Sequence, residues 1–344
     1  MANILIFLER LDPRESIAQT YRYSKEHKYV LHIPQILRPT LKNWIKKKRL
    51  PLVEQMKKLL ICFGLSWRSL FYDVVILREG TMAMFLSAFL MWRKRPKVII
   101  LHFNVLQRRN AVWLLVSRLL LRRVDCFIVH SKYDLDFVPE LYKLPYNRFV
   151  FYPYIRVQPQ LQVAEKEAPF TNDNKPYIMS YGIKARDYHT FFEAVRGAYL
   201  KVVVVTRKFI IEGLEIPNNV KVLFDIPLEE CDRLVSNCLF TVFTFDGTEP
   251  SCGQISIITS LILGKPVICT DCTAVKDYII DGYNGLLVNM RDAEDLRDKM
   301  LRLYGDRRLY ESLSDGAKEW AIKNVVPEDF QVFMDKIVTE LTTK

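Results

Sequence analysis

Short apolar runs alternate along this chain with longer segments in which apolar positions recur at helical spacing. Residues 2–8, 98–103 and 202–206 read ANILIFL, VIILHF and VVVVT. Uninterrupted apolar runs of this length are typical of strands that are buried on both faces of a parallel sheet. Strands that alternate with helices in this way predict an α/β protein with doubly wound sheets.

The same pattern places the remaining elements. Gly264 follows an apolar segment at the position where a C-terminal glycine ends a helix. The predicted strands are 2–8, 29–33, 73–77, 98–103, 126–130, 149–153, 177–181, 202–206, 220–224, 240–245 and 267–270; the predicted helices are 16–26, 81–92, 111–121, 255–263, 292–304, 309–324 and 328–341.

The chain is long enough for two domains. It has 344 residues, and residues 158–175 are rich in Gln, Glu, Pro and Asn without periodicity. We therefore expect a first domain over residues 1–157, a linker at 158–175 and a second domain over 176–326. Residues 327–344 are expected to form a final helix.

Charge is spread unevenly between the two predicted halves. Residues 1–158 hold 28 basic and 11 acidic side chains, whereas residues 159–344 hold 22 basic and 28 acidic ones. This asymmetry predicts an anionic partner for the first half: an anionic membrane, a lipid phosphate acceptor or nucleic acid. Nucleic acid is the weakest of these, because no recognised binding motif accompanies the charge.

The cysteines and the lengths of the apolar runs indicate the cellular compartment of the protein. The seven cysteines are scattered through apolar contexts, which favours free thiols in a reducing cytoplasm. No run reaches the roughly 20 residues of a membrane-spanning helix, and no secretory signal is evident. We expect a cytoplasmic protein, peripheral on the inner face of the membrane if the basic half binds lipid.

Residues 251–288 carry the most informative motif. A loop of small residues, Ser251-Cys252-Gly253, precedes the apolar helix, and Gly264-Lys265-Pro266, a buried strand and the turn DGYNG follow it. A helix that begins at such a loop directs free amides and a partial positive charge outward. This arrangement suits a phosphate.

This run resembles the nucleotide-sugar-binding half of GT-B glycosyltransferases of the family-4-like group, through its loop, its apolar helix, "GKPVI" and "DYIIDGYNGLLV". The resemblance implies a GT-B fold, in which two Rossmann-like domains face a central cleft. It also implies a nucleotide-diphosphate sugar as the donor substrate, no metal or other cofactor, and retention of anomeric configuration. The acceptor would approach from the first domain, and the final helix, residues 327–344, would cross back to that domain.

The resemblance also suggests donor-binding residues. The end of the first strand in the second domain would supply Gly182, Lys184 and Arg186, and the end of the next strand Arg207 and Lys208, with basic groups that neutralise the departing diphosphate. The alternative for these residues is a solvated turn. The loop and its helix would supply Ser251, Cys252, Gly253, Gln254 and Thr259.

The loop departs from the commonest family pattern, which has two glutamates eight positions apart. Ser251 and Thr259 occupy those positions here, which leaves the ribose contact and the donor sugar open. Glu249 or Asp246 can replace the first carboxylate from the strand end. We therefore take Glu249 as a candidate catalytic residue.

His102 is the second candidate catalytic residue, because it ends a strand of the first domain where ligands of α/β sheets bind. A neutral imidazole there can hydrogen-bond a sugar hydroxyl. The alternative is a histidine satisfied within the core. His130, which ends the next strand, is a weaker candidate.

Residues 41–68 and 93–97 interleave Lys and Arg with Trp, Leu and Phe. This composition suits an anionic membrane interface, and the alternative is an ordinary solvated amphipathic helix.

Three functions remain open at this point. The first is a hexosyltransferase-type glycosyltransferase that acts on a polysaccharide or lipid-linked glycan. The second is a non-catalytic GT-B-like module that binds a glycan or nucleotide. The third is another Rossmann-type enzyme, such as an epimerase, which should carry several carboxylates and histidines in its cleft.

Overall fold

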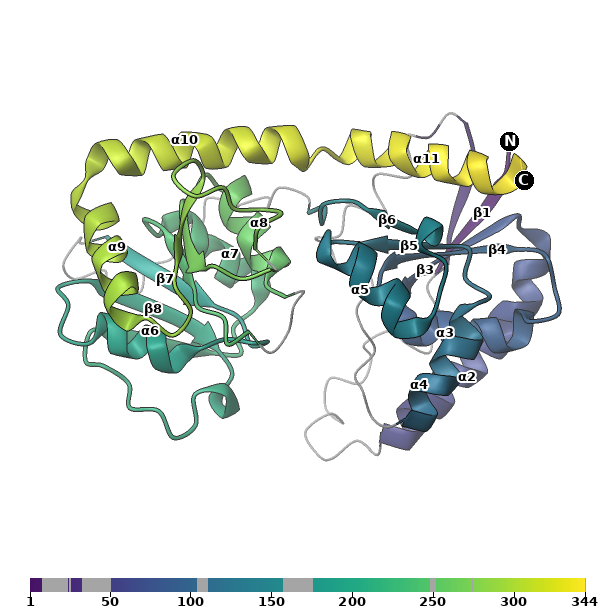
Figure 1. The fold of residues 1–344 in the computed structure, drawn as a ribbon, viewed down its shortest axis with the longest axis horizontal. Coiled ribbons are helices and arrows are strands. Elements are labelled where there is room, and N and C mark those ends of the chain that lie inside the picture. The colour runs from purple at the N-terminus through teal and green to yellow at the C-terminus, as the bar shows by residue number, and fades with distance from the viewer. Residues whose placement is uncertain are drawn as a thin grey trace. The chain divides into compact units, whose positions relative to one another are not determined.

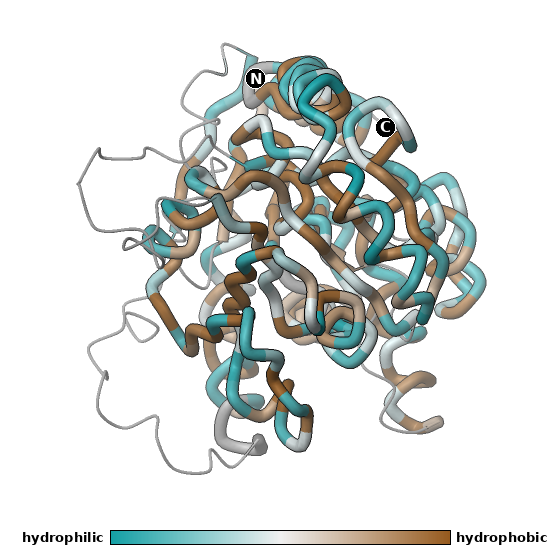
Figure 2. The backbone as a smooth tube through the Cα atoms, turned by 90° about the vertical axis from the view of Figure 1, so that its left-hand side faces the viewer, coloured by the Kyte–Doolittle hydropathy of each residue, from teal (hydrophilic) through white to brown (hydrophobic). Residues whose placement is uncertain are grey.

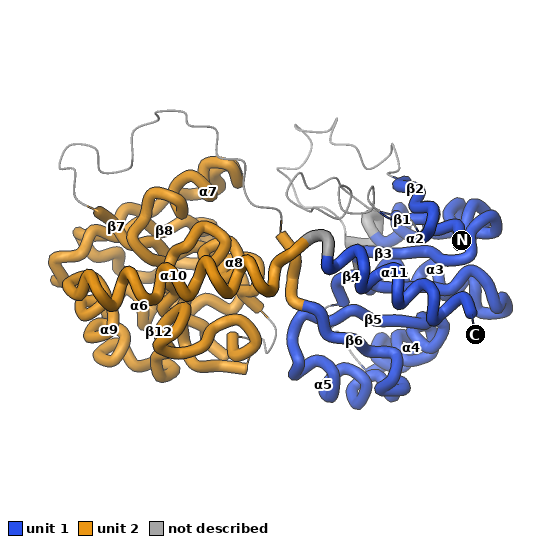
Figure 3. The backbone as a smooth tube through the Cα atoms, turned by 90° about the horizontal axis from the view of Figure 1, so that it is seen from above, with its two compact units in different colours: residues 1–152, 327–344 blue, residues 153–326 orange. Residues whose placement is uncertain are grey.

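The computed structural model describes residues 1–7, 24, 26–32, 51–103, 111–156, 176–247, 252–273 and 275–343, without the side chains of residues 51–54, 79, 327 and 328. It divides into two compact units (Figure 3). Unit 1 comprises Met1–Tyr152 together with Pro327–Lys344, and unit 2 comprises Pro153–Val326. The predicted linker at 158–175 and nearly all of the predicted helix at 16–26 lie outside the described residues.

Unit 1 is built on a sheet of six parallel strands in the order β2-β1-β3-β4-β5-β6. Most residues of the inner strands are apolar, and Ile4, Val75 and Ile99 are fully buried. Strand bounds are β1 Asn3–Phe7, β2 Lys28–His32, β3 Val74–Glu79, β4 Lys97–His102, β5 Cys126–Val129 and β6 Phe149–Phe151.

Helices cover both faces of this sheet (Figure 1). A layer of three helices lies on one face, in which α3 packs between α2 and α4. The bounds are α2 Pro51–Arg68, α3 Gly80–Leu90, α4 Ala111–Leu121 and, beside α4, α5 Tyr133–Tyr142; short 3-10 turns occupy Ser69–Phe71 and Tyr146–Arg148.

The last helix of the chain, α11 (Pro327–Thr343), lies on the other face of the unit 1 sheet (Figure 1). His27 Nε2 lies 3.3 Å from the carbonyl oxygen of Asp335 and 3.1 Å from Thr339 Oγ1. Tyr29 donates its hydroxyl to Asp335 Oδ1 at 2.6 Å. Residues at the two ends of the sequence thus complete one unit.

Unit 2 is built on a second sheet of six parallel strands, in the order β12-β11-β10-β7-β8-β9. The two sheets confirm the predicted doubly wound α/β class. Strand β12 was not predicted, because its four residues directly follow the glycine turn. Strand bounds are β7 Tyr177–Tyr181, β8 Lys201–Thr206, β9 Val220–Phe224, β10 Thr241–Phe243, β11 Val267–Thr270 and β12 Gly285–Val288.

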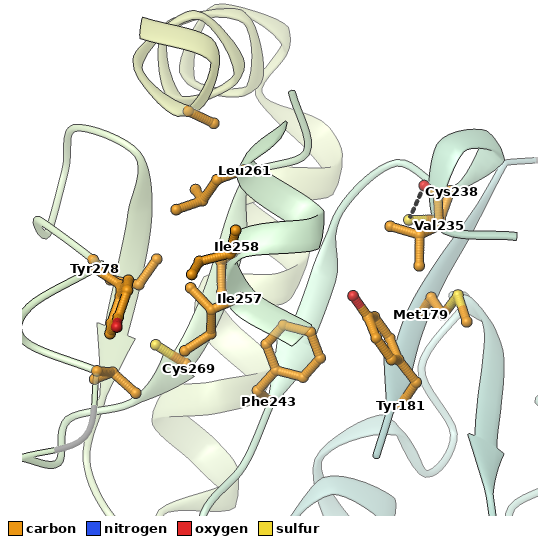
Figure 4. Close-up of a cluster of buried hydrophobic side chains, with 14 of the residues drawn as sticks. Met179, Tyr181, Val235, Cys238, Phe243, Ile257, Ile258, Leu261, Cys269 and Tyr278 are labelled. Carbon is orange, nitrogen blue, oxygen red and sulfur yellow. Dashed lines mark hydrogen bonds between the residues drawn. The ribbon is translucent and has the colours of Figure 1, made fainter. Parts of the chain in front are cut away.

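Two hydrophobic clusters sandwich the unit 2 sheet. One joins the sheet to α7 (Leu228–Asn237), α8 (Gln254–Ile262) and α10 (Arg307–Asn324). Figure 4 shows its centre, where Phe243 of β10 lies between Tyr181 and Ile257. The other joins the sheet to α6 (Tyr188–Val195) and α9 (Ala293–Gly305). Apolar and polar residues alternate along the coiled segments of the backbone (Figure 2).

The DGYNG turn is closed from inside by Asn284. This fully buried side chain accepts a hydrogen bond from the amide of Ile280 and donates one to the carbonyl oxygen of Tyr278. Gly316 of α10 packs directly on the turn, because a Cβ there would lie 2.0 Å from the carbonyl oxygen of Tyr283. Among the described residues, no helix is both long and apolar enough to cross a bilayer.

Candidate functional site

The candidate site of unit 2 begins at the carboxyl end of β7, where the loop to α6 starts. Gly182 has φ of +127°, and its amide donates to the carbonyl oxygen of Val205 in β8. Glycine populates this backbone region without steric cost, so the loop turns sharply as it leaves the sheet. Asp187 then caps α6 by accepting the amide of Thr190.

This loop is fixed to the end of β10 by three hydrogen bonds. The amide of Asp187 donates to the carbonyl oxygen of Thr244, and Thr244 Oγ1 donates to that of Asp187. The amide of Asp246 donates to the carbonyl oxygen of Ala185. The residue between these contacts, Arg186, is therefore held in place by its backbone.

The guanidinium of Arg186 is enclosed by protein. Nε donates to the carbonyl oxygen of Tyr181 at 3.2 Å, and Nη2 donates to Ser256 Oγ at 3.1 Å. The group stacks on the rings of Phe243 and Phe245, at 5.1 and 4.6 Å from their centroids. Burial lowers the pKa of this arginine, since desolvation disfavours the charged form.

The remaining nitrogen of the Arg186 guanidinium is Nη1. Nη1 is buried and has no hydrogen-bond partner in the part of the chain that the structure describes. A buried donor without a partner costs free energy, and more when it is charged. Arg186 Nη1 is therefore placed to bind an anion.

Gly253 borders this nitrogen and precedes the first turn of α8. Its φ is +84°, and a Cβ there would lie 2.4 Å from the ring of Phe245 and 3.2 Å from Arg186 Nη1. The first amides of a helix are free and carry a partial positive charge. The start of α8 and Arg186 thus provide two positive groups side by side, which fits a phosphate.

The remaining predicted donor residues fall into three groups. Lys184, Arg207 and Lys208 are exposed, and Arg207 Nε lies 3.5 Å from Asp225 Oδ1. Cys252 is buried, whereas Gln254 at the start of α8 is half-buried. Glu249 and Ser251 lie outside the described residues.

Thr259 faces into unit 2. It is fully buried, and its hydroxyl donates to the carbonyl oxygen of Ile255 at 2.6 Å, one turn earlier in α8. In this structure the hydroxyl serves its own helix, so a ribose contact from this position requires the side chain to rotate.

Unit 1 carries a pair of histidines at the ends of β4 and β5. His130 Nδ1 lies 2.7 Å from the carbonyl oxygen of Tyr152, so this nitrogen carries the proton and donates it. Nε2 of the neutral ring then accepts from His102 Nδ1, 2.5 Å away, and the carbonyl oxygen of Leu101 lies 3.0 Å from the same Nε2. This assignment leaves His102 Nε2 with its lone pair.

Burial keeps both rings neutral. Desolvation lowers the pKa of His130 to about 4, against the smaller opposing effect of the neighbouring carbonyl oxygens of Tyr152 and Leu101, which favour the charged ring. The pKa of His102 also lies well below its ordinary value, through desolvation first and then the neighbouring His130 and Arg78. A neutral His102 can accept a hydrogen bond near pH 7.

The structure adds site residues that the sequence did not reveal. Ser256 accepts from Arg186, and Phe243 and Phe245 form the walls around its guanidinium. The spacing of the two phenylalanines was a usable signal, since alternate residues of a strand face one side. The described residues hold no group of three or more histidine, cysteine, aspartate or glutamate side chains arranged to bind a metal.

Comparison with known proteins bears on this geometry. The family described as "Glycosyl transferases group 1" matches residues 200–320, which include α8 and the strands β8 to β12. Over these residues the chain is similar to the group 1 glycosyl transferases. The matched segment covers Gly253 and the DGYNG turn and begins after Arg186.

Two curated glycosyltransferases match part of the chain. An uncharacterized glycosyltransferase of Methanocaldococcus jannaschii is 28% identical over 116 residues, which are 33% of this chain and 32% of the relative. The N,N'-diacetylbacillosaminyl-diphospho-undecaprenol alpha-1,3-N-acetylgalactosaminyltransferase of Campylobacter jejuni is 24% identical over 110 residues, 31% and 28% of the two chains. The chain thus matches about a third of each.

Solved structures agree over nearly the whole of this chain. HepE of Anabaena, in complex with UDP and glucose, superposes with a TM-score of 0.72 at 14% identity, over 99% of this chain and 100% of HepE. Sucrose-phosphate synthase of Thermosynechococcus elongatus gives 0.73 at 15% identity, over 100% of both chains. At these identities the likeness establishes the fold, which is GT-B.

Proposed function

We propose that this protein transfers a glycosyl group from a nucleoside-diphosphate sugar to an acceptor. The observation that carries the proposal is the buried Arg186 Nη1, which has no partner among the described residues and borders Gly253 at the start of α8. A diphosphate group placed there supplies the anion that the site lacks. The family match over residues 200–320 and the UDP named in the HepE complexes support this donor class.

The same groups serve the reaction. As the bond between the sugar and the diphosphate breaks, negative charge accumulates on the departing phosphate. The guanidinium of Arg186 and the free amides of α8 stabilise that charge, and they need no rearrangement because both are held in position. The exposed Lys184, Arg207 and Lys208 add a positive field around the nucleotide.

His102 and Glu249 complete the proposed catalytic groups. The neutral His102 would accept a hydrogen bond from a sugar hydroxyl. Glu249 would supply a carboxylate toward the donor sugar in place of the residue at Ser251. The proposal includes retention of configuration and no requirement for a metal, as in the enzymes that the sequence resembles.

The acceptor is proposed to be a growing polysaccharide or a lipid-linked glycan. The Campylobacter jejuni relative bears the name of an enzyme whose substrate is a diphospho-undecaprenol. The excess of basic side chains in residues 1–158 is consistent with such an anionic acceptor. A cytoplasmic location at the inner face of the membrane follows from this proposal.

A nucleotide panel tests the donor. UDP, GDP, uridine and guanosine are titrated by calorimetry, and each nucleotide sugar whose nucleotide binds is incubated with the protein and assayed for release of the diphosphate. We expect one nucleoside diphosphate to bind at least tenfold more tightly than its nucleoside, and its sugar to be hydrolysed slowly. Equal affinity for nucleoside and diphosphate would contradict the role of Arg186.

The alternative of a non-catalytic GT-B-like module has one observation in its favour. Position 259, which holds a glutamate in the commonest family pattern, is a buried threonine here. Tight diphosphate binding without any release of product, with every sugar of the panel and with added lipid-linked acceptors, would select this alternative.

A further inference from the structure

Helix α4 presents apolar side chains where a helix of a water-soluble surface carries polar ones. Val112 and Leu115 are 67% and 60% exposed, and Val116 and Leu119 are also exposed. These positions recur every three or four residues, so they form one stripe along the helix. The opposite side of α4 is buried through Ser117 and Leu121.

Helix α2 repeats this arrangement. Its core contacts come from Cys62 and Leu65, which are buried. Leu60 is 68% exposed, and Phe63 and Trp67 continue the same exposed side. Both helices therefore use one apolar stripe for the core and display a second one outward.

Helix α3 connects the two stripes. It packs between α2 and α4, and Phe89 meets Phe63 edge-on with ring centroids 5.5 Å apart. Phe85, one turn before Phe89, is also only partly buried. The exposed apolar side chains of these three adjacent helices together make up what we call the outer helical face. Exposed apolar surfaces of this extent mark interaction sites.

Every charged side chain described within these three helices is basic. The described side chains of α2, α3 and α4, and of the turns that follow α3 and α4 up to residue 124, include no aspartate or glutamate. The helices run antiparallel to the strands, so their carboxyl ends gather at one edge. That edge carries Arg68, Arg93, Lys94, Arg95 and Arg122. Two acidic side chains lie at the same edge: Asp73 pairs with Arg95, and Asp125 pairs with Arg123 and Lys97.

The basic edge is fixed to the helices. Arg93 Nη1 donates to the carbonyl oxygen of Ser66 in α2, and Arg123 Nε donates to that of Leu90 in α3. Trp92 projects from the same turn and is 93% exposed. Tryptophan prefers the boundary between acyl chains and head groups, where its ring is apolar and its N–H is hydrated.

We propose that the outer helical face docks on a bilayer that contains anionic phospholipid. The apolar stripes of α2 and α4 enter the head-group region, and the basic edge binds the phosphates. A membrane fits better than a protein partner, because apolar side chains with an excess of positive charge around them match a surface that is apolar inside and negative outside. This inference goes beyond the transfer reaction and uses none of the donor-site residues.

Vesicle flotation tests the apolar part. The full chain is mixed with vesicles of phosphatidylcholine and phosphatidylglycerol, or of phosphatidylcholine alone. We expect binding to the anionic vesicles only, and at least a tenfold loss of binding for the double variant Leu115→Gln, Leu119→Gln. The matched control is Val332→Gln on α11, which is 70% exposed on the other face of the same unit and should bind like the unchanged protein.

A second pair of variants tests the basic edge. Lys94→Gln with Arg122→Gln removes two exposed cations of that edge. We expect each substitution to lower the affinity for anionic vesicles about fivefold. Lys28→Gln with Lys336→Gln removes the same charge from β2 and α11 and should have little effect. Rising salt should release the unchanged protein, because the Debye length falls from about 10 Å at 0.1 M to about 3 Å at 1 M.

Several results would overturn the proposal. One is the absence of binding to anionic vesicles, and another is equal loss in the test and control variants. A third is self-association that the α4 double variant abolishes, which would assign the outer helical face to a second copy of the chain. Nucleotide affinity, measured without vesicles, should be unchanged in all these variants, so failure here is distinguishable from failure of the donor site.

Discussion

Arg186 Nη2 and Ser256 Oγ, 70 residues apart in sequence, are joined by a hydrogen bond of 3.1 Å. The bond ties the loop after β7 to the first turn of α8, and it orients the guanidinium so that Nη1 lies beside Gly253. The anion site therefore depends on two segments that the fold brings together, and several variants can test each side of it.

Arg186→Met should weaken the binding of a nucleoside diphosphate about 10- to 100-fold, because it removes a charge-assisted hydrogen bond. Binding of the nucleoside should hardly change. The variant should fold at least as stably as the parent, since a buried cation without its anion is costly. Calorimetry and thermal melting without ligand check both parts, and Arg207→Met at an exposed position is the control. A large loss of stability would indicate a structural role for the arginine.

Gly253→Ala should destabilise the protein and impair donor binding together. The new Cβ would lie 2.4 Å from the ring of Phe245, at a residue with φ of +84°. Gly213→Ala separates the two causes, because Gly213 has φ of +81° and nothing within 4 Å of the added carbon. We expect about 1 kcal/mol of lost stability at Gly213 from the backbone alone, and about 1–3 kcal/mol more at Gly253. Urea denaturation measures both, and equal losses would argue against the close contact.

Gly316→Ala should destabilise α10, although alanine favours an isolated helix by about 1 kcal/mol. The added carbon would meet the carbonyl oxygen of Tyr283 at 2.0 Å, and backbone atoms cannot move aside cheaply. We expect a net loss of about 2 kcal/mol or more. Gly305→Ala at the end of α9, where nothing lies within 4 Å, should be neutral or stabilising. A stabilising Gly316→Ala would mean that α10 does not rest on the turn.

The histidine pair should make unit 1 sensitive to acid. The pKa of His130 is lowered to about 4 and that of His102 is lowered too, so the unfolded chain binds more protons than the folded one below pH 6.5. The contribution of the neutral histidine pair to the free energy of unfolding should therefore be complete above about pH 6.5 and decrease as the pH drops toward 4. The slope is at most about 1.4 kcal/mol per pH unit for each ring.

Urea denaturation at several pH values tests this slope. His130→Asn, whose amide can still donate to the carbonyl oxygen of Tyr152, should flatten the dependence, whereas the same change at the exposed His189 should leave it unaltered. A slope that persists in His130→Asn would locate the acid-sensitive groups elsewhere.

His102→Gln should lower turnover at least tenfold, a barrier change of about 1.4 kcal/mol, and leave nucleotide affinity within twofold. Steady-state kinetics with the donor identified by the panel and a calorimetric titration give the two numbers. A variant that melts earlier yet keeps its activity per folded molecule would make His102 a packing residue.

Most of the fold is predictable from the sequence, because parallel strands that are buried on both faces leave continuous apolar runs. Strand 177–181 and helix 111–121 were predicted with the bounds that the structure gives. Strand β12 was missed, since four residues after a glycine turn carry too little periodicity. The sequence also gave no sign that half of α4 is exposed, because an apolar helix looks the same whether one side or both are covered.

The candidate site is predictable only in part. Arg186 and Gly253 follow from their places at a strand end and a helix start. The enclosure of the guanidinium by Phe243 and Phe245 depends on contacts between segments about 60 residues apart, which local patterns do not encode. For the same reason the sequence alone does not predict that the side chain of Thr259 points into unit 2.

The packing of α11 against the segment around His27 sets an order for biosynthesis. Unit 2 is one continuous stretch of chain that is entirely synthesised before the last helix leaves the ribosome. Unit 1 instead needs Asp335 and Thr339 to satisfy His27, 308 and 312 residues earlier. The N-terminal strands must therefore wait, incompletely covered, until α11 has been synthesised, and a protein truncated before α11 would leave unit 1 unfinished while unit 2 is complete.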